Sequence, residues 1–174
     1  MHTLVIGGSA SGKSELAERL ALACPAPRYY IATMEVRDGE SKRRVARHRA
    51  LRAGKGFRTL ECPVRLRALR LPAPGGTALV ECVTNLAANE CFSARGAGRK
   101  DAASAILAGA QALMRQAHCI FVTGDVFADG IAYAAGTQEY LEVLAAVNAG
   151  LAARCAHVAE AVCGLPQWLK GGPC

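Results

Sequence analysis

The chain has 174 residues, of which 52% are hydrophobic and 20% charged, so we expect one globular domain over residues 1–174 rather than a disordered chain. No apolar run approaches the roughly 18 residues that a membrane span needs, and no charged segment precedes a long apolar stretch, so we expect a cytoplasmic protein without a secretory signal. The formal net charge is +7, but aromatic residues make up only 5%, which argues against stacking on bases and against a nucleic-acid partner.

The first predicted element is a short apolar strand at residues 4–6 that leads directly into a glycine-rich turn. Residues 7–14 read G-x-x-x-x-G-K-S and consist of Gly7, Gly8, Ser9, Ala10, Ser11, Gly12, Lys13 and Ser14. A P-loop, which binds phosphate through its backbone N–H groups, requires this motif between a strand and a helix. We therefore expect Lys13 to reach the β- and γ-phosphates of a nucleotide and Ser14 to hold Mg²⁺. The alternative, a Gly/Ser-rich turn without a ligand, does not explain why strand, motif and helix agree.

Helical and strand patterns alternate after the P-loop. Residues 14–24 predict a helix that ends at two prolines, and residues 28–32 predict a strand with Thr33 at its carboxyl end. Residues 35–53 predict a polar helix on which Arg44, His48 and Arg52 recur every four residues and share one face. The two arginines would lower the pKa of His48 and favour a neutral, nucleophilic imidazole that could accept a phosphoryl or nucleotidyl group. A bystander histidine on a charged helix is the alternative.

A strongly basic segment runs from residue 42 to residue 70, with eleven lysines or arginines and Glu61 as its one acid. The segment is either a solvated helix face or a cradle for an anionic ligand such as a nucleotide. Within and after it we expect a strand at 57–62, a short basic helix at 64–71 and a turn at 72–76. The next strand, 77–81, ends in Glu81, which is either a Walker-B-like acid that serves Mg²⁺ or a cap of the following helix.

The second half repeats the alternation. We expect helices at 84–92, 102–118 and 138–155, a flexible basic loop at 93–100, a buried strand at 119–123 and a last strand at 158–163. The loop at 124–136 carries Asp125 and Asp129. The eight cysteines form no C-x-x-C pair, so we expect free, mostly buried thiols and no metal centre built from them. The pattern predicts an α/β P-loop NTPase fold with a mostly parallel sheet and helices on both faces.

The order of these motifs resembles the adenosylcobinamide kinase/adenosylcobinamide-phosphate guanylyltransferase family of cobalamin biosynthesis. The resemblance rests on residues 7–14, 30–33, 44–52, 57–61 and 81–84, followed by Asn89. The P-loop alone is generic. The helix reading R-x-x-x-H-x-x-x-R, followed at this distance by R-T-x-E, is much more specific.

The resemblance implies a RecA-like P-loop domain with two activities. One phosphorylates adenosylcobinamide at the P-loop, with ATP or GTP as donor. The other transfers GMP from GTP to adenosylcobinamide phosphate through a GMP adduct on the histidine at position 48, giving adenosylcobinamide-GDP. Family members assemble as homotrimers. Lys13 and His48 would be catalytic, and Ser14 and Glu81 would serve the metal. Besides residues 7–14, the expected nucleotide contacts are Ala32, Thr33, Met34, Arg49, Ala50, Leu51, Arg52, Glu61 and Glu81.

The second half departs from the family pattern. The family usually reads Asn-Glu-Val-Gly-x-Gly-Ile-Val-Pro after its fifth strand, whereas only an acid, a valine and Gly130-Ile131 remain in residues 124–133. The following helix has no basic residue between 140 and 148. Two alternatives therefore stay open, a P-loop small-molecule kinase in which His48 only neutralises phosphate charge, and a weakened GTP-binding paralogue with an altered substrate loop.

Overall fold

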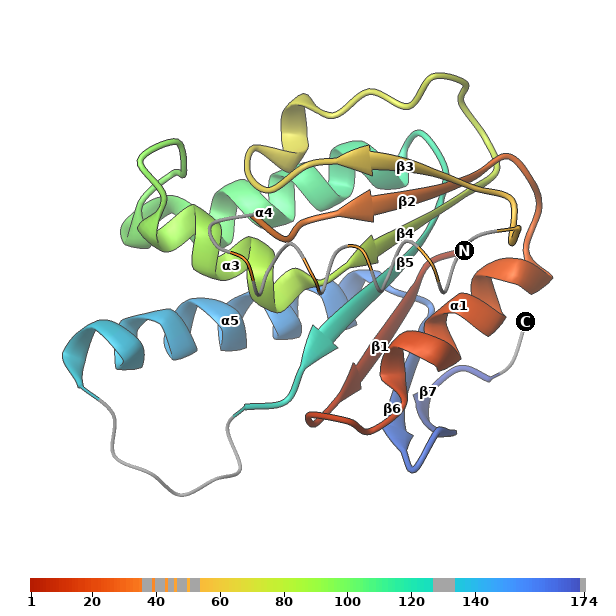
Figure 1. Ribbon diagram of the computed structural model, residues 1–174. Coiled ribbons are helices and arrows are strands. Elements are labelled where there is room, and N and C mark those ends of the chain that lie inside the picture. Colours follow the sequence, from red (N-terminus) through yellow and green to blue (C-terminus); the bar gives the residue numbers. More distant parts are fainter. Residues whose placement is uncertain are drawn as a thin grey trace.

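The computed structural model describes residues 1–35, 39, 43, 46, 50, 54–126 and 134–172. Its centre is a sheet of seven strands in the order β3-β2-β4-β5-β1-β6-β7 (Figure 1). The first six strands in this order run parallel, and β7 pairs antiparallel with β6 at the edge. The strands are β1 (Thr3–Gly7), β2 (Arg28–Ala32), β3 (Phe57–Glu61), β4 (Thr77–Glu81), β5 (His118–Gly124), β6 (His157–Val162) and β7 (Leu165–Lys170).

Helices cover both faces of this sheet. Helix α1 (Lys13–Ala23) packs on one face, where Leu16, Ala17 and Ala21 meet apolar side chains of β1, β2, β4, β5 and β6. Helices α3 (Val83–Phe92), α4 (Arg99–Met114) and α5 (Ala135–Arg154) form the larger core on the other face (Figure 1). The side chains of β4 are buried along its whole length, as a strand between two helical layers requires. The predicted α/β fold is confirmed.

The register of the parallel strands brings their carboxyl ends to one edge. Ala32 of β2 lies opposite both Glu61 of β3 and Glu81 of β4, and Gly7 of β1 lies opposite Gly124 of β5. In open α/β sheets ligands bind at this edge. The glycine-rich turn and the acid at the end of β4 therefore stand on the same side of the molecule.

Two segments, 64–71 and 93–100, differ from the sequence prediction. Residues 64–71 do not form a helix beyond a single 3₁₀ turn, η1 (Leu66–Ala68). The amide of Gln116 receives a hydrogen bond from Leu71 N (2.9 Å) and donates one to Leu69 O (3.2 Å), so a side chain satisfies backbone groups that a longer helix would use. The loop at 93–100 is shorter than expected, because Arg99 already begins α4.

The strand at 158–163 is not the last one. Strand β7 follows it after a turn of two residues, Cys163 and Gly164, whose φ angles are 50° and 79°. Two consecutive positive φ angles give a type I′ turn, which usually carries asparagine or aspartate before the glycine. Cysteine in the first position hides this hairpin in the sequence. Pro166 is tolerated in β7 because the strand lies at the sheet edge.

The expectation of free, mostly buried thiols is confirmed for the described residues. The seven described cysteines form no disulfide, and Cys62, Cys91, Cys119 and Cys155 are buried. Across the described residues, no helix is long and apolar enough to cross a membrane. Most of the helix expected at 35–53, with His48, lies outside the described residues, and so do residues 127–133 of the loop at 124–136.

Candidate active site

The glycine-rich turn after β1 has the backbone shape that a phosphate cradle needs. Ala10 and Gly12 adopt left-handed conformations with φ angles of 57° and 84°, and α1 begins directly at Lys13. Ser9 and Ala10 at the tip of the turn are exposed, so the loop is open to a ligand. Successive N–H groups at a helix N-terminus attract anions through their partial positive charge. The backbone N–H groups of this turn can therefore bind phosphate.

Lys13 and Ser14, the first two residues of α1, contact different parts of the site. The ammonium of Lys13 donates to the carbonyl of Gly8 at 2.8 Å, so it lies over the turn that would receive the phosphates. The hydroxyl of Ser14 donates to Oε1 of Glu81, a residue 67 positions away at the end of β4. Two adjacent residues thus place a cation over the loop and join α1 to the end of β4, two strands away from β1 in the sheet.

Glu81 is the best-placed acid for a divalent cation. Its side chain is buried, Oε1 accepts from Ser14, and Oε2 has no hydrogen-bond partner among the described residues. A buried carboxylate oxygen without a partner carries a desolvation cost that a bound cation would offset. Hydroxyl and carboxylate oxygens are also the hard ligands that Mg²⁺ prefers. The pair therefore fits the Mg²⁺ that the sequence analysis expects, with Ser14 and Glu81 as the residues that would hold it.

The end of β2 is held firmly next to Glu81. Thr33 is fully buried. Its backbone N–H donates to Glu81 O at 3.1 Å, and its hydroxyl donates to Cys82 O at 2.8 Å. The amide of Asn89 in α3 donates to Thr33 O (2.8 Å) and to Pro63 O (3.0 Å) beyond β3. The Thr33 side chain is thus used inside the protein, while Ala32 and Met34 on either side are partly exposed and Glu61 is exposed.

The end of β5 lies beside the P-loop. The N–H of Asp125 donates to Gly7 O at 3.1 Å, and the N–H of Gly124 donates to the hydroxyl of Thr84 at 2.8 Å. The buried Asn148 of α5 accepts from Thr123 Oγ1 at 2.7 Å and donates to Gly124 O at 3.4 Å. Thr84 and Asn148 were not predicted as part of the site, because a single polar residue in a helix gives no periodic signal.

The expected nucleotide-binding residues divide into two groups. The structure brings residues 7–14, Ala32, Thr33, Met34, Glu61 and Glu81 to one sheet edge. Ala50 is helical and exposed. The other expected residues, His48, Arg49, Leu51 and Arg52, lie outside the described residues, as does Arg44.

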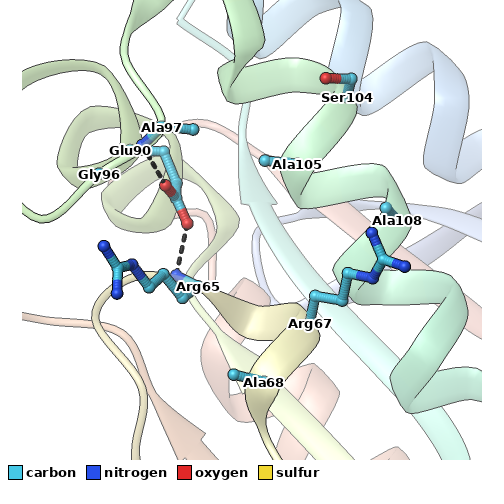
Figure 2. A pocket seen from close by; sticks show the side chains of 9 residues that line it. All are labelled: Arg65, Arg67, Ala68, Glu90, Gly96, Ala97, Ser104, Ala105 and Ala108. Carbon is cyan, nitrogen blue, oxygen red and sulfur yellow. Dashed lines mark hydrogen bonds between the residues drawn. The ribbon is translucent and has the colours of Figure 1, made fainter.

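A separate pocket with a volume of about 650 Å³ lies between η1, the end of α3 and α4 (Figure 2). It contains no residue of the expected site. Glu90, buried at its wall, accepts hydrogen bonds from the backbone N–H groups of Arg65 and Ala97, while Arg67 extends toward Ala108. The Glu90 carboxylate is therefore used to join the segment after β3 to the loop at 93–98. The pocket is distinct from the P-loop edge.

Comparisons with known proteins show the family to which the chain is similar. A family model described as cobinamide kinase / cobinamide phosphate guanyltransferase matches residues 3–169. The "Bifunctional adenosylcobalamin biosynthesis protein CobP" of Pseudomonas aeruginosa is 35% identical over 178 residues, which cover 99% of each chain. The "Bifunctional adenosylcobalamin biosynthesis protein CobU" of Salmonella typhimurium is 39% identical over 99 residues, 55% of this chain and 53% of the relative.

Proposed function

The chain belongs to the cobinamide kinase / cobinamide phosphate guanyltransferase family, and we propose that it carries out both reactions at the P-loop edge of its sheet. It is an enzyme of cobalamin biosynthesis. It phosphorylates adenosylcobinamide and then transfers GMP to the product. The observation that carries the site assignment is the hydrogen bond from Ser14 to Glu81 beside Lys13, at the carboxyl ends of β1 and β4.

The kinase reaction follows from what these residues can do. The N–H groups of the P-loop and the start of α1 would bind the phosphates of ATP or GTP, and Lys13 would stabilise the negative charge that develops during phosphoryl transfer. Ser14 and Glu81 would hold Mg²⁺, which neutralises phosphate charge when bound. The rigid contacts of Thr33 and Asp125 support this role, because transfer depends on fixed positions more than on covalent chemistry by the protein.

The guanylyl transfer is proposed to use His48 as nucleophile, as the resemblance implies. An imidazole nitrogen attacks the α-phosphorus of GTP, an N–P bond forms, and the P–O bond to the departing diphosphate breaks. A phosphate oxygen of adenosylcobinamide phosphate then attacks the same phosphorus. The N–P bond breaks and adenosylcobinamide-GDP forms, which returns His48 to its neutral state. The arginines at 44 and 52, four positions away on either side, would favour the neutral imidazole before attack.

Mass spectrometry of the intact protein after incubation with GTP and Mg²⁺ tests this assignment. The wild-type protein should gain the mass of a GMP adduct that survives alkali and is lost in acid. His48→Asn should gain none, while phosphorylation of adenosylcobinamide persists because it needs no covalent intermediate. His157→Asn, at the opposite end of the sheet, is the matched control and should keep the adduct. An adduct on the His48→Asn protein would refute the role of His48.

The resemblance also implies a homotrimer that works in the cytoplasm. We propose this assembly for the present chain, whose mass is 18.2 kDa.

A further inference from the structure

The turn between β6 and β7, formed by Cys163 and Gly164, contacts the P-loop, and Figure 1 shows the β6–β7 hairpin beside the loop that joins β1 to α1. The N–H of Gly164 donates to Ser11 O at 2.8 Å, although 153 positions separate the two residues. A Cβ added at Gly12 would lie 2.6 Å from the Cα and 2.9 Å from the N of Gly164, closer than real Cβ atoms approach other atoms. The backbones of the turn and of the P-loop are therefore in direct contact.

The other glycine of the motif is also backed by this hairpin. A Cβ at Gly7 would lie 2.5 Å from Oγ of Ser11 in the P-loop and 3.1 Å from the carbonyl oxygen of Ala161 in β6. Both end glycines of G-x-x-x-x-G thus face the same hairpin. Their small size serves this packing as well as the close approach of a phosphate. Any displacement of the β6–β7 turn would act on Ser11 and Gly12, immediately before Lys13.

A third contact connects the turn to the helix that follows the P-loop. Arg19, in α1, donates from Nη2 to Gly164 O at 2.8 Å. Gly164 therefore donates to the loop through its N–H and accepts from the helix through its carbonyl. Because the P-loop and α1 together form the phosphate-binding unit, a single residue of the turn connects to both parts of it.

From these contacts we propose that the β6–β7 turn is a positioning element for nucleotide binding, with Gly164 and Arg19 as its positioning residues. They hold the backbone N–H groups of residues 11–13 in the arrangement that receives the β- and γ-phosphates. Neither residue contacts the reacting atoms in this role. The proposal rests on the proposed function, since it assumes that the P-loop binds the triphosphate.

Gly164→Ala tests the turn without changing the charge. A methyl group at Gly164 has open space, but its φ of 79° is strained for alanine, so the turn should shift. Gly75→Ala is the matched control. Gly75 also has open space and a φ of 86°, and it precedes β4 at the opposite edge of the sheet. Both variants should lose similar thermal stability, and only Gly164→Ala should weaken triphosphate binding.

The affinities for MgGTP, MgATP and GMP, measured by calorimetry, give the decisive readout. Gly164→Ala should lower both triphosphate affinities by about threefold to tenfold, the scale of one lost hydrogen bond to a well-placed partner, and leave GMP affinity unchanged. GMP lacks the β- and γ-phosphates to which the N–H groups of residues 11–13 would donate, so its affinity should not depend on their position. Triphosphate affinities equal to those of Gly75→Ala, or a parallel loss for GMP, would overturn the proposal.

Arg19→Ala provides a second test if Gly164→Ala does not fold. Its control is Arg154→Ala, which removes an exposed arginine that also donates to a backbone carbonyl, Gly150 O at 2.7 Å. Arg19→Ala should reduce the ratio of triphosphate affinity to GMP affinity. The reduction should persist at high salt, because salt screens the long-range attraction between the Arg19 charge and the phosphates. An unchanged ratio would overturn the proposal. Lys13→Ala is measured in parallel. If Lys13→Ala left triphosphate binding intact, the proposed function itself would fail. If Lys13→Ala weakened triphosphate binding while Arg19→Ala left the ratio unchanged, only the positioning role of the turn would fail.

Discussion

At the scale of single residues, Lys13 should contribute to transition-state stabilisation more than to the fold. Its ammonium donates to Gly8 O, and the residue is partly exposed. Lys13→Ala should lower kinase turnover by at least about a hundredfold, because fixed charges near the phosphates dominate this kind of catalysis. Steady-state kinetics with ATP measures the effect. Lys170→Ala, which removes a lysine bonded to the end of α5, should behave as wild type. Near-wild-type turnover of Lys13→Ala would exclude its role.

Glu81 permits an isosteric test of the metal site. Glu81→Gln keeps an oxygen that can accept from Ser14, but removes the negative charge and the unpartnered carboxylate oxygen. We expect the Mg²⁺ concentration for half-maximal rate to rise by about tenfold to a hundredfold, a scale typical of changes near a metal. A Mg²⁺ titration of initial rates checks this. Glu142→Gln, on the exposed side of α5, is the control. Unchanged titrations would make Glu81 purely structural.

The P-loop and Glu81 could be predicted because each lies at the junction of a clear strand with a helix or loop. Thr84, Asn89 and Asn148 could not be predicted as supports of the site. Their function depends on backbone carbonyls and N–H groups from distant strands, which no local pattern encodes. Thr33 was predicted to contact the nucleotide, and the structure shows that its hydroxyl donates a hydrogen bond to Cys82 O.

At the scale of elements, Asn89 joins α3 to the ends of β2 and β3. Its amide donates to Thr33 O and Pro63 O, and the side chain is buried. Asn89→Leu should lower the free energy of unfolding by about 1–3 kcal/mol, because it leaves two carbonyls without donors in a buried place. Urea unfolding measures this loss. Gln138→Leu, at an exposed position of α5, is the control and should change the stability little.

Long apolar elements were the easiest to predict, and short connections the hardest. Helix α4 follows from its periodicity and strand β5 from its continuous apolar run, whereas η1 depends on the Gln116 amide and β7 on a type I′ turn that begins with cysteine. The β6–β7 hairpin forms one edge of the sheet and contacts the P-loop, so it depends on contacts between residues far apart in the chain. Sequence patterns of a few residues do not contain this information.

At the scale of the whole molecule, histidines at the amino-terminal edge of the sheet should make stability depend on pH. The rings of His2 and His118 stack with centroids 6.1 Å apart. Burial, followed by the charge of the N-terminal amino group, lowers the pKa of His2 to about 4 and also lowers the pKa of His118. The fold therefore favours the neutral imidazoles. Below about pH 6.5 the unfolded chain therefore binds more protons at these two histidines than the folded chain does.

The contribution of this pair to the free energy of unfolding should be fully present above about pH 6.5 and should be lost as the pH falls toward 4. Urea unfolding between pH 7 and pH 5 measures the effect, in a range where most carboxylates stay charged. The His2→Asn protein, whose amide oxygen can still accept from Cys119 N, should show a smaller decrease than wild type. Equal decreases in both proteins would show that the pair does not cause the pH dependence.

The protein phosphorylates adenosylcobinamide and then guanylylates the product. Incubation of the protein with adenosylcobinamide, GTP, ATP and Mg²⁺, followed by mass spectrometry of the corrinoids over time, tests these two reactions most directly. We predict that adenosylcobinamide phosphate forms first and that adenosylcobinamide-GDP then accumulates with release of diphosphate. Recovery of unchanged adenosylcobinamide from a protein that binds MgATP and MgGTP would contradict the account.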